Sequence, residues 1–211
     1  MEIEQLIHKL SNEARPVKPM ANPWRLTSQW ILGFVAYLTL LLVTVETPRD
    51  DIMLQLGTPL FALEIMALVL TIIACALGAA LLSYPDLYQS KRIAYLPIIA
   101  FILFAGIVVA AFIAEGNPME LHPAEFWCTS MITLYSLPPA IWLFYSIQRF
   151  ASTHFSLAGS VAVLTAFSIG ALALRLTEKT DSMAHVLAYH YLPMLAVGAF
   201  GLALGRKFLR W

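Results

Sequence analysis

AHVLAYHYLPMLAVGAFGLALGRKFLRW, residues 184–211, is an apolar run that ends in basic and aromatic side chains. A helix needs about 20 consecutive, mostly apolar residues to cross the hydrocarbon core of a bilayer, and this run is long enough. It contains one histidine–proline step, from His190 to Pro193, and its tail carries Arg206, Lys207, Arg210 and Trp211. We therefore expect a membrane-spanning helix here, with the other apolar runs of the chain packed around it.

The composition of the whole chain agrees with a membrane protein. Of its 211 residues, 60% are hydrophobic and only 12% are charged, whereas a soluble domain usually carries about 25% charged residues. The chain contains six apolar runs, separated by helix-breaking and charged residues. They lie at residues 28–45, 59–83, 93–114, 126–147, 156–175 and 183–205. The sequence therefore predicts an all-α membrane protein with six transmembrane helices.

The charge distribution predicts how the helices are oriented. If the N-terminus is cytoplasmic, ten of the 13 Lys and Arg residues lie on the cytoplasmic side and three, Arg49, Arg175 and Lys179, lie on the other. Cytoplasmic loops carry the excess of Lys and Arg in multi-pass proteins. We therefore expect both termini to be cytoplasmic. The net charge of zero gives no reason to expect direct binding to nucleic acid.

Residues 1–27 form a separate segment ahead of the predicted six-helix bundle at 28–211. Four apolar side chains are spaced like one face of a helix: Ile3, Leu6, Ile7 and Leu10. Pro16 ends this predicted helix, and a Pro-rich basic strap follows it. Such a face needs a surface to cover it, either the membrane lipid or a partner protein.

Glu64 is the one acidic residue inside a predicted span. An ionisable residue within the membrane is costly and is a functional candidate by default. One interpretation is an ion pair with Arg175, which ends the fifth span at the same face. The other is a role in binding a proton or a ligand.

Further polar side chains are predicted at the same depth as Glu64. Cys128 begins the fourth span, and His185 and His190 begin the sixth. Thiolate and imidazole are ligands that zinc and copper accept, so these residues are candidate sensor or metal-site residues. No spacing in the sequence demands a metal, however, and polar contacts between helices are the alternative. A small transporter or membrane enzyme built on Glu64, Cys128 and His190 is the corresponding alternative function.

Both ends of the chain resemble one protein family. The opening EQLIHKLSNEARPVKPMANPWR, residues 4–25, and the ending HVLAYHYLPMLAVGAFGLALGRKFLRW, residues 185–211, are similar to those of the NrsF-type negative regulators of ECF sigma factors. Cys128 and the step Leu137-Pro138-Pro139 also resemble that family. The resemblance extends over the whole chain.

This resemblance implies a bacterial inner-membrane anti-sigma factor rather than an enzyme, with no cofactor and no small-molecule substrate. The N-terminal segment of the family is thought to hold an ECF sigma factor at the membrane. By position, the resemblance assigns this contact to seven residues of the present chain: Leu6, Leu10, Arg15, Pro16, Val17, Lys18 and Pro19.

The chain departs from the family pattern at two positions. The second cysteine common in the family is absent near Thr177, and Tyr189 replaces a favoured tryptophan. The missing cysteine argues against sensing by a thiol pair and leaves Cys128 as the one thiol that a metal or an oxidant could target. The expected function is release of the sigma factor on an envelope, metal or oxidative stress signal.

Overall fold

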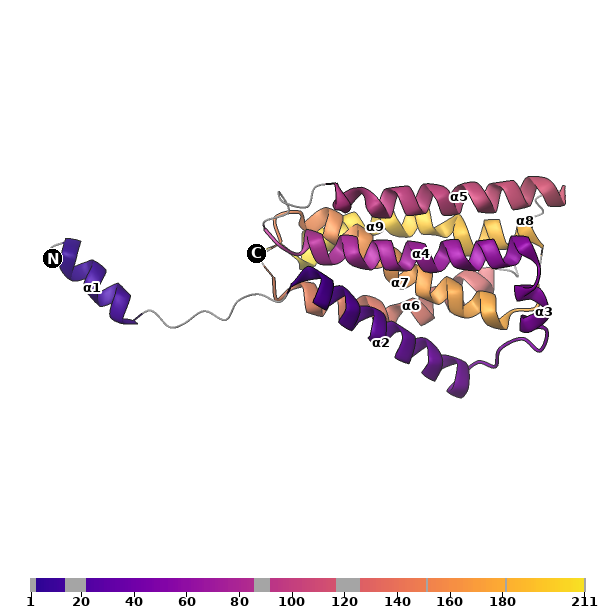
Figure 1. Cartoon of the computed structure of the whole chain (residues 1–211), viewed down its shortest axis with the longest axis horizontal. Coiled ribbons are helices and arrows are strands. Elements are labelled where there is room, and N and C mark those ends of the chain that lie inside the picture. Colours follow the sequence, from indigo (N-terminus) through magenta and orange to yellow (C-terminus); the bar gives the residue numbers. More distant parts are fainter. Residues whose placement is uncertain are drawn as a thin grey trace.

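A computed structural model describes residues 3–13, 22–85, 92–116, 126–150, 152–180 and 182–210 (Figure 1). Most of these residues are helical, and none of them lies in a strand. The elements are α1 (Ile3–Glu13), α2 (Pro23–Thr44), α3 (Ile52–Leu56), α4 (Pro59–Leu82), the 3-10 helix η2 (Ile93–Tyr95), α5 (Leu96–Glu115), α6 (Phe126–Ile147), α7 (Phe155–Thr177), α8 (Met183–His185), the π-helix η4 (Val186–Tyr191) and α9 (Pro193–Phe208).

Six helical segments of the described residues are long and apolar enough to cross a membrane. They are α2, α4, η2 with α5, α6, α7, and the run from α8 to α9, which confirms the six predicted spans. The largest difference at the start of a helix is at α2, which begins at Pro23 rather than at residue 28. The reason is local, because the side chain of Asn22 caps the helix by accepting a hydrogen bond from the amide of Trp24 at 2.9 Å.

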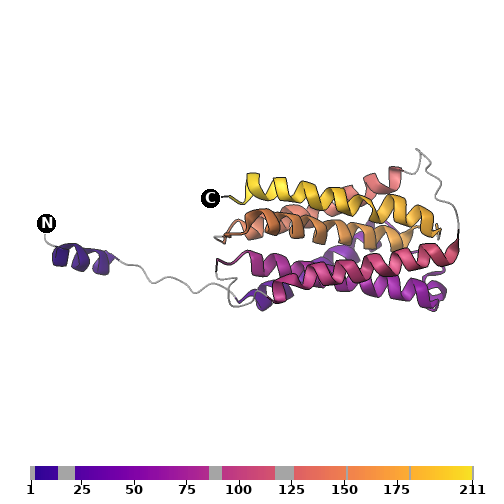
Figure 2. The same ribbon diagram turned by 90° about the horizontal axis from the view of Figure 1, so that it is seen from above.

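The expectation that the last segment forms the centre of the bundle is wrong. In α4 and α7, 72% of the most apolar stretch is buried, against 44% in the segment Met183–Phe208 and 28% in α2. Figures 1 and 2 show α7 between α4, α6 and α9. The small residues of α7 allow this position, since its alanines and glycines let three neighbouring helices approach closely.

Glycines allow the backbones of α7 and α9 to pack closely. A Cβ atom on Gly159 would lie 2.4 Å from the Cα atom of Gly205 and 2.6 Å from the carbonyl oxygen of Gly201. Without side chains at these positions the two backbones pack directly, which is how helices associate strongly in a membrane.

The outer surface of the bundle is apolar. Large side chains that point away from the core are highly exposed, among them Leu32 at 70%, Val43 at 77%, Ile113 at 70% and Ile141 at 67%. A continuous surface of this kind on six spanning helices is suited to lipid and not to water. The protein is therefore a multi-pass membrane protein.

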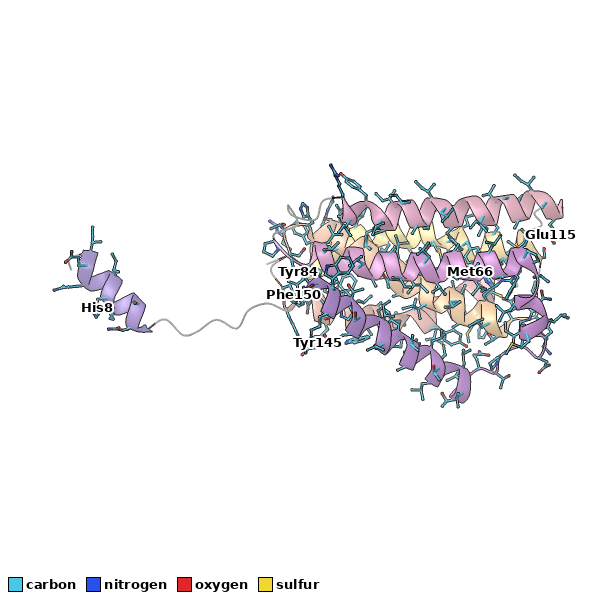
Figure 3. All side chains as sticks on the ribbon, in the orientation of Figure 1. His8, Met66, Tyr84, Glu115, Tyr145 and Phe150 are labelled. Carbon is cyan, nitrogen blue, oxygen red and sulfur yellow. The ribbon has the colours of Figure 1, made fainter. Side chains whose placement is uncertain are left out.

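Charged residues divide the two ends of the bundle. We call the end with Arg25, Arg92, Arg149, Arg206, Lys207 and Arg210 the basic end, and the end with Glu46, Asp50, Asp51, Glu115 and Glu178 the acidic end. Figure 3 shows Tyr145 and Phe150 at the first end and Glu115 at the second. The start of α2 and the C-terminus both lie at the basic end, and α1 lies beyond it (Figure 2).

Candidate functional site

The last span begins with an irregular turn that brings two histidines together. In η4 the amide of Leu192 donates to the carbonyl of Leu187, five residues back, at 2.8 Å. Such a π-turn stacks residues that are five apart, and π-turns are frequent at functional sites. The ring centroids of His185 and His190 consequently lie 5.3 Å apart. Residues five apart do not share a face in an α-helix, so the sequence placed both histidines at one depth but did not predict that their rings would lie together.

The carboxylate of Glu178 joins these histidines to Cys128. Glu178 directly follows α7, and its Oε1 lies 3.2 Å from Nε2 of His185 while its Oε2 lies 2.9 Å from Nε2 of His190. The thiol of Cys128, on the first turn of α6, donates to Oε1 at 3.5 Å. One ligand atom from each of the four residues lies within 4.8 Å of the others. We call Cys128, Glu178, His185 and His190 the four-residue cluster.

Two contacts between α6 and Tyr189 hold the cluster in place. The hydroxyl of Thr129 donates to the carbonyl oxygen of Tyr189 at 2.6 Å, which fixes η4 against α6. The ring of Phe126 packs edge-on against Tyr189 with centroids 5.4 Å apart. The position of the histidines relative to Cys128 is thus set by main-chain and aromatic contacts as well as by Glu178.

Glu178 remains ionised in this setting. Its burial disfavours the charged carboxylate, but the neighbouring imidazoles of His190 and His185 and the Cys128 thiol outweigh burial, so the pKa of Glu178 falls below its ordinary value. His190 is fully buried, and neither of its ring nitrogens has a hydrogen bond of good geometry among the described residues, although Nε2 lies 2.9 Å from Oε2 of Glu178. A buried ring nitrogen without a partner is costly unless a proton acceptor, a water or a metal completes the site.

The donor set of the cluster suits a borderline metal ion. One sulfur, two imidazole nitrogens and one carboxylate oxygen are ligands that zinc takes in fourfold sites, and copper accepts the same sulfur and nitrogen donors. The spacing of the four atoms is somewhat wider than in a closed zinc site, so the side chains would have to move inward. As they stand, the four residues make polar contacts between α6, α7 and the last span.

Glu64 lies outside this cluster, in a buried ion pair. Nε of Arg175 donates to Oε1 of Glu64 at 2.9 Å, and Nη2 donates to Oε2 at 3.2 Å. The hydroxyl of Tyr191 also donates to Oε1. Both charged side chains are 2% exposed. The predicted pairing of Glu64 with Arg175 is therefore confirmed, and Glu64 is not one of the four residues of the cluster.

The ion pair and the cluster nevertheless share two structural elements. Arg175 and Glu178 stand one turn apart at the end of α7, and His190 and Tyr191 are neighbours in η4. The other contacts of Arg175 reinforce this arrangement, since Nη1 donates to the carbonyl of Thr180 at 3.1 Å and the guanidinium lies 4.6 Å from the ring centroid of Phe61. A movement of η4 would therefore change the contacts of both the ion pair and the cluster.

Two functional candidates were missed in the sequence, Glu178 and Tyr191. Glu178 is not singled out in the sequence analysis, although it stands one turn after Arg175. Tyr191 is buried and reaches Glu64 only because η4 turns it toward α4. Cys75, by contrast, is buried in α4, and neither cysteine is in a disulfide.

The N-terminal helix is present as predicted. In α1, Ile3 is 77% exposed and Ile7 is 61% exposed. Leu6 and Leu10 also belong to α1, but their side chains are outside the described part of the chain. The predicted contact residues Arg15, Pro16, Val17, Lys18 and Pro19 fall outside the described residues as well.

Comparison with known protein families agrees with the resemblance noted in the sequence. The family described as "NrsF: Negative regulator of sigma F" matches residues 10–211. Searches among curated proteins and among solved structures gave no significant match. The match includes all six spans, the Glu64–Arg175 pair and the four-residue cluster. The chain therefore belongs to the NrsF family, whose name describes negative regulation of a sigma factor.

Proposed function

We propose that this protein is a bacterial inner-membrane anti-sigma factor that holds an ECF sigma factor through residues 1–27. The observation that carries the proposal is α1, an amphipathic helix whose apolar residues Ile3 and Ile7 are exposed, attached to a bundle that otherwise lies within the membrane. An exposed apolar helix face is a common docking element for a groove on a soluble protein. The family match supports a sigma factor as that protein.

The charge distribution supports a cytoplasmic position for α1. In Figure 2, α1 lies beyond the basic end of the bundle. This end carries the excess of Lys and Arg that is typical of the cytoplasmic side of multi-pass proteins. Sigma factors act in the cytoplasm, so a helix on that side can reach one. The acidic end, with the four-residue cluster, would then face the periplasm and its chemistry.

Two substitutions in α1 test the contact. We expect Ile3→Asp with Ile7→Asp to weaken co-purification of the cognate sigma factor at least ten-fold, because each buried isoleucine contributes about 1.5–3 kcal/mol. The measurement is the amount of sigma factor retained by the full-length protein in mild detergent. Glu4→Ala with Lys9→Ala, on the polar positions of the same helix, is the matched control and should retain it.

The alternative surface for α1 is lipid, and the same pair of variants separates the two. If α1 only lies on the membrane, the isoleucine variant will bind the sigma factor as well as the unmodified protein does. That result, obtained with a bundle that still elutes as a single species, would contradict the proposal.

We further propose that the four-residue cluster is the sensor. Its support is the buried, incompletely bonded His190 beside a thiol and an ionised carboxylate at the acidic end. The four-residue cluster would hold a metal ion. The bound metal would supply positive charge beside Glu178, which now pairs with the two histidines. A change in η4 or at the end of α7 would then affect Glu64 through its contacts with Arg175 and Tyr191. Release of the sigma factor requires that the bundle prefer another conformation once the cluster is altered.

Metal titration tests the sensor. We expect the purified protein, with its thiols reduced, to bind one Zn²⁺ and His190→Gln to bind it at least ten-fold more weakly, since one of four ligands is lost. Calorimetric titration measures both affinities. Cys75→Ser is the control, because Cys75 is buried far from the cluster and should not change the affinity. Equal affinities for the unmodified protein and for His190→Gln would eliminate this site.

The structure favours regulation over the alternative of a transporter or enzyme based on Glu64. Transport or catalysis would need Glu64 to exchange a proton or a ligand. Arg175 instead holds both of its carboxylate oxygens, and Tyr191 adds a third hydrogen bond. Such a pair stabilises one arrangement of α4, α7 and η4.

A further inference from the structure

A groove runs along the lipid-facing side of the bundle between α6 and α9, with α7 as its floor. Its volume is about 530 Å³, and it is lined mainly by apolar side chains, among them Ile141, Tyr145, Phe167, Phe200 and Phe208. Phe167, 1% exposed, belongs to the core, whereas Ile141, Tyr145 and Phe200 are each at least 60% exposed. We call this feature the α6/α9 groove.

The groove has the length of one lipid leaflet. Along α6 it extends from Thr133 to Gln148, which corresponds to about 22 Å at 1.5 Å per residue. One leaflet, with its headgroup region, contributes about half of the roughly 40–45 Å total thickness of a bilayer, or about 20–22 Å. The groove therefore begins near the middle of the membrane and ends at the basic end of the bundle.

Two cations stand on the rim of the groove at that end. The guanidinium of Arg149 lies 4.6 Å from the ring centroid of Tyr145, and Nζ of Lys207 lies 5.4 Å from that of Phe208. Both rings line the groove. The side chain of Gln148 joins the two helices at the same place by donating to the carbonyl oxygen of Phe208 at 3.0 Å.

No described carboxylate neutralises these cations. The acidic residues described in the bundle, Glu46, Asp50, Asp51, Glu64, Glu115 and Glu178, all belong to its acidic half. Arg149 and Lys207 make only the contacts with aromatic rings given above and no ion pair within the described chain. Both side chains are exposed. The α6/α9 groove thus ends beside two positive charges that have no negative partner in the described part of the chain.

We propose that the α6/α9 groove binds one anionic phospholipid, with an acyl chain along the groove and the phosphate between Arg149 and Lys207. Anionic headgroups are attracted to Lys and Arg at the membrane surface, and the chain would fill an apolar space that cannot hold water well. A second copy of the protein fits less well, because parallel copies in one membrane would bring two basic ends together. This inference does not depend on the sigma factor.

Lipid retention by the intact protein tests the proposal. The delipidated protein in mild detergent is mixed with phosphatidylglycerol or with phosphatidylcholine of the same acyl chains, and native mass spectrometry counts the lipids retained. We expect one phosphatidylglycerol per chain, retained roughly ten-fold better than phosphatidylcholine, with a higher unfolding temperature by mass action. Equal retention of the two lipids would overturn the proposal.

Charge variants locate the site. Arg149→Gln with Lys207→Gln should lose the preference for phosphatidylglycerol, whereas Arg25→Gln with Arg92→Gln, at the same end but away from the groove, should keep it. Equal losses in both pairs would indicate diffuse surface charge and contradict a specific site. Ala140→Phe, which fills the groove, should reduce retention of either lipid. If it instead converts a dimer to a monomer, the groove belongs to a second copy and the proposal is wrong.

Discussion

Gly159→Leu is expected to prevent the native packing of α7 against α9. A Cβ atom alone at this position would lie 2.4 Å from Cα and 2.7 Å from N of Gly205, and these backbone atoms cannot rotate away. Overpacking usually costs about 1–3 kcal/mol and more when the backbone has to shift. Since proteins are stable by only about 5–15 kcal/mol, we expect a cost of at least about 3 kcal/mol and poor recovery of monodisperse protein.

The matched control is another glycine within a helix. Gly106, in α5, is exposed, and a Cβ there would have no neighbour within 4 Å. Gly106→Leu should leave the midpoint of unfolding in denaturing detergent unchanged or slightly higher, because leucine favours the helix more than glycine does. If Gly159→Leu and Gly106→Leu unfold at the same midpoint, close packing of α7 and α9 is not what holds the bundle together.

Glu64→Leu should have the second large effect. The change removes the carboxylate that holds Nε and Nη2 of Arg175 and leaves a guanidinium that is 2% exposed without its counter-charge. Breaking a buried pair in this way typically costs about 3–5 kcal/mol. The measurement is again the unfolding midpoint, with secondary structure followed by circular dichroism.

A double mutant separates the pair from its surroundings. Glu64→Leu with Arg175→Leu should recover much of the stability lost in Glu64→Leu, because no charge then remains buried. The exposed pair of Lys179 with Asp50, at 3.0 Å, provides the control, and Asp50→Asn should cost less than about 1 kcal/mol. Additive losses in the double mutant would show that Glu64 and Arg175 are not energetically coupled.

The candidate site was only partly predictable, and its parts show why. Cys128, His185 and His190 were recognisable as polar residues at similar depth, since depth follows from position along an apolar run. Their neighbour Glu178 was not, because it lies in the connection after α7, whose path is a tertiary property. The pair of His185 and His190 depends on η4, and a single π-turn leaves no clear periodic pattern in the residues around it.

The exposed apolar face of α1 was predictable from spacing, because a face of four apolar residues at helical intervals is a local property. Its partner was not, since an apolar helix face suits lipid and protein alike. The family match begins at Leu10, within α1, so the contact through Ile3 and Ile7 rests on the helix and not on the match.

The sequence by itself determined the number and extent of the six spans and the separation of basic from acidic residues at the two ends. Both follow from one physical rule, that the hydrocarbon core accepts about 20 apolar residues and rejects charge. Only the tertiary structure decided that α4 and α7, and not the last segment, occupy the centre. Lipid and the protein interior are equally apolar, so hydrophobicity does not show which helix is buried among the others. Close packing contacts, such as that between Gly159 and Gly205, determine which helices are central.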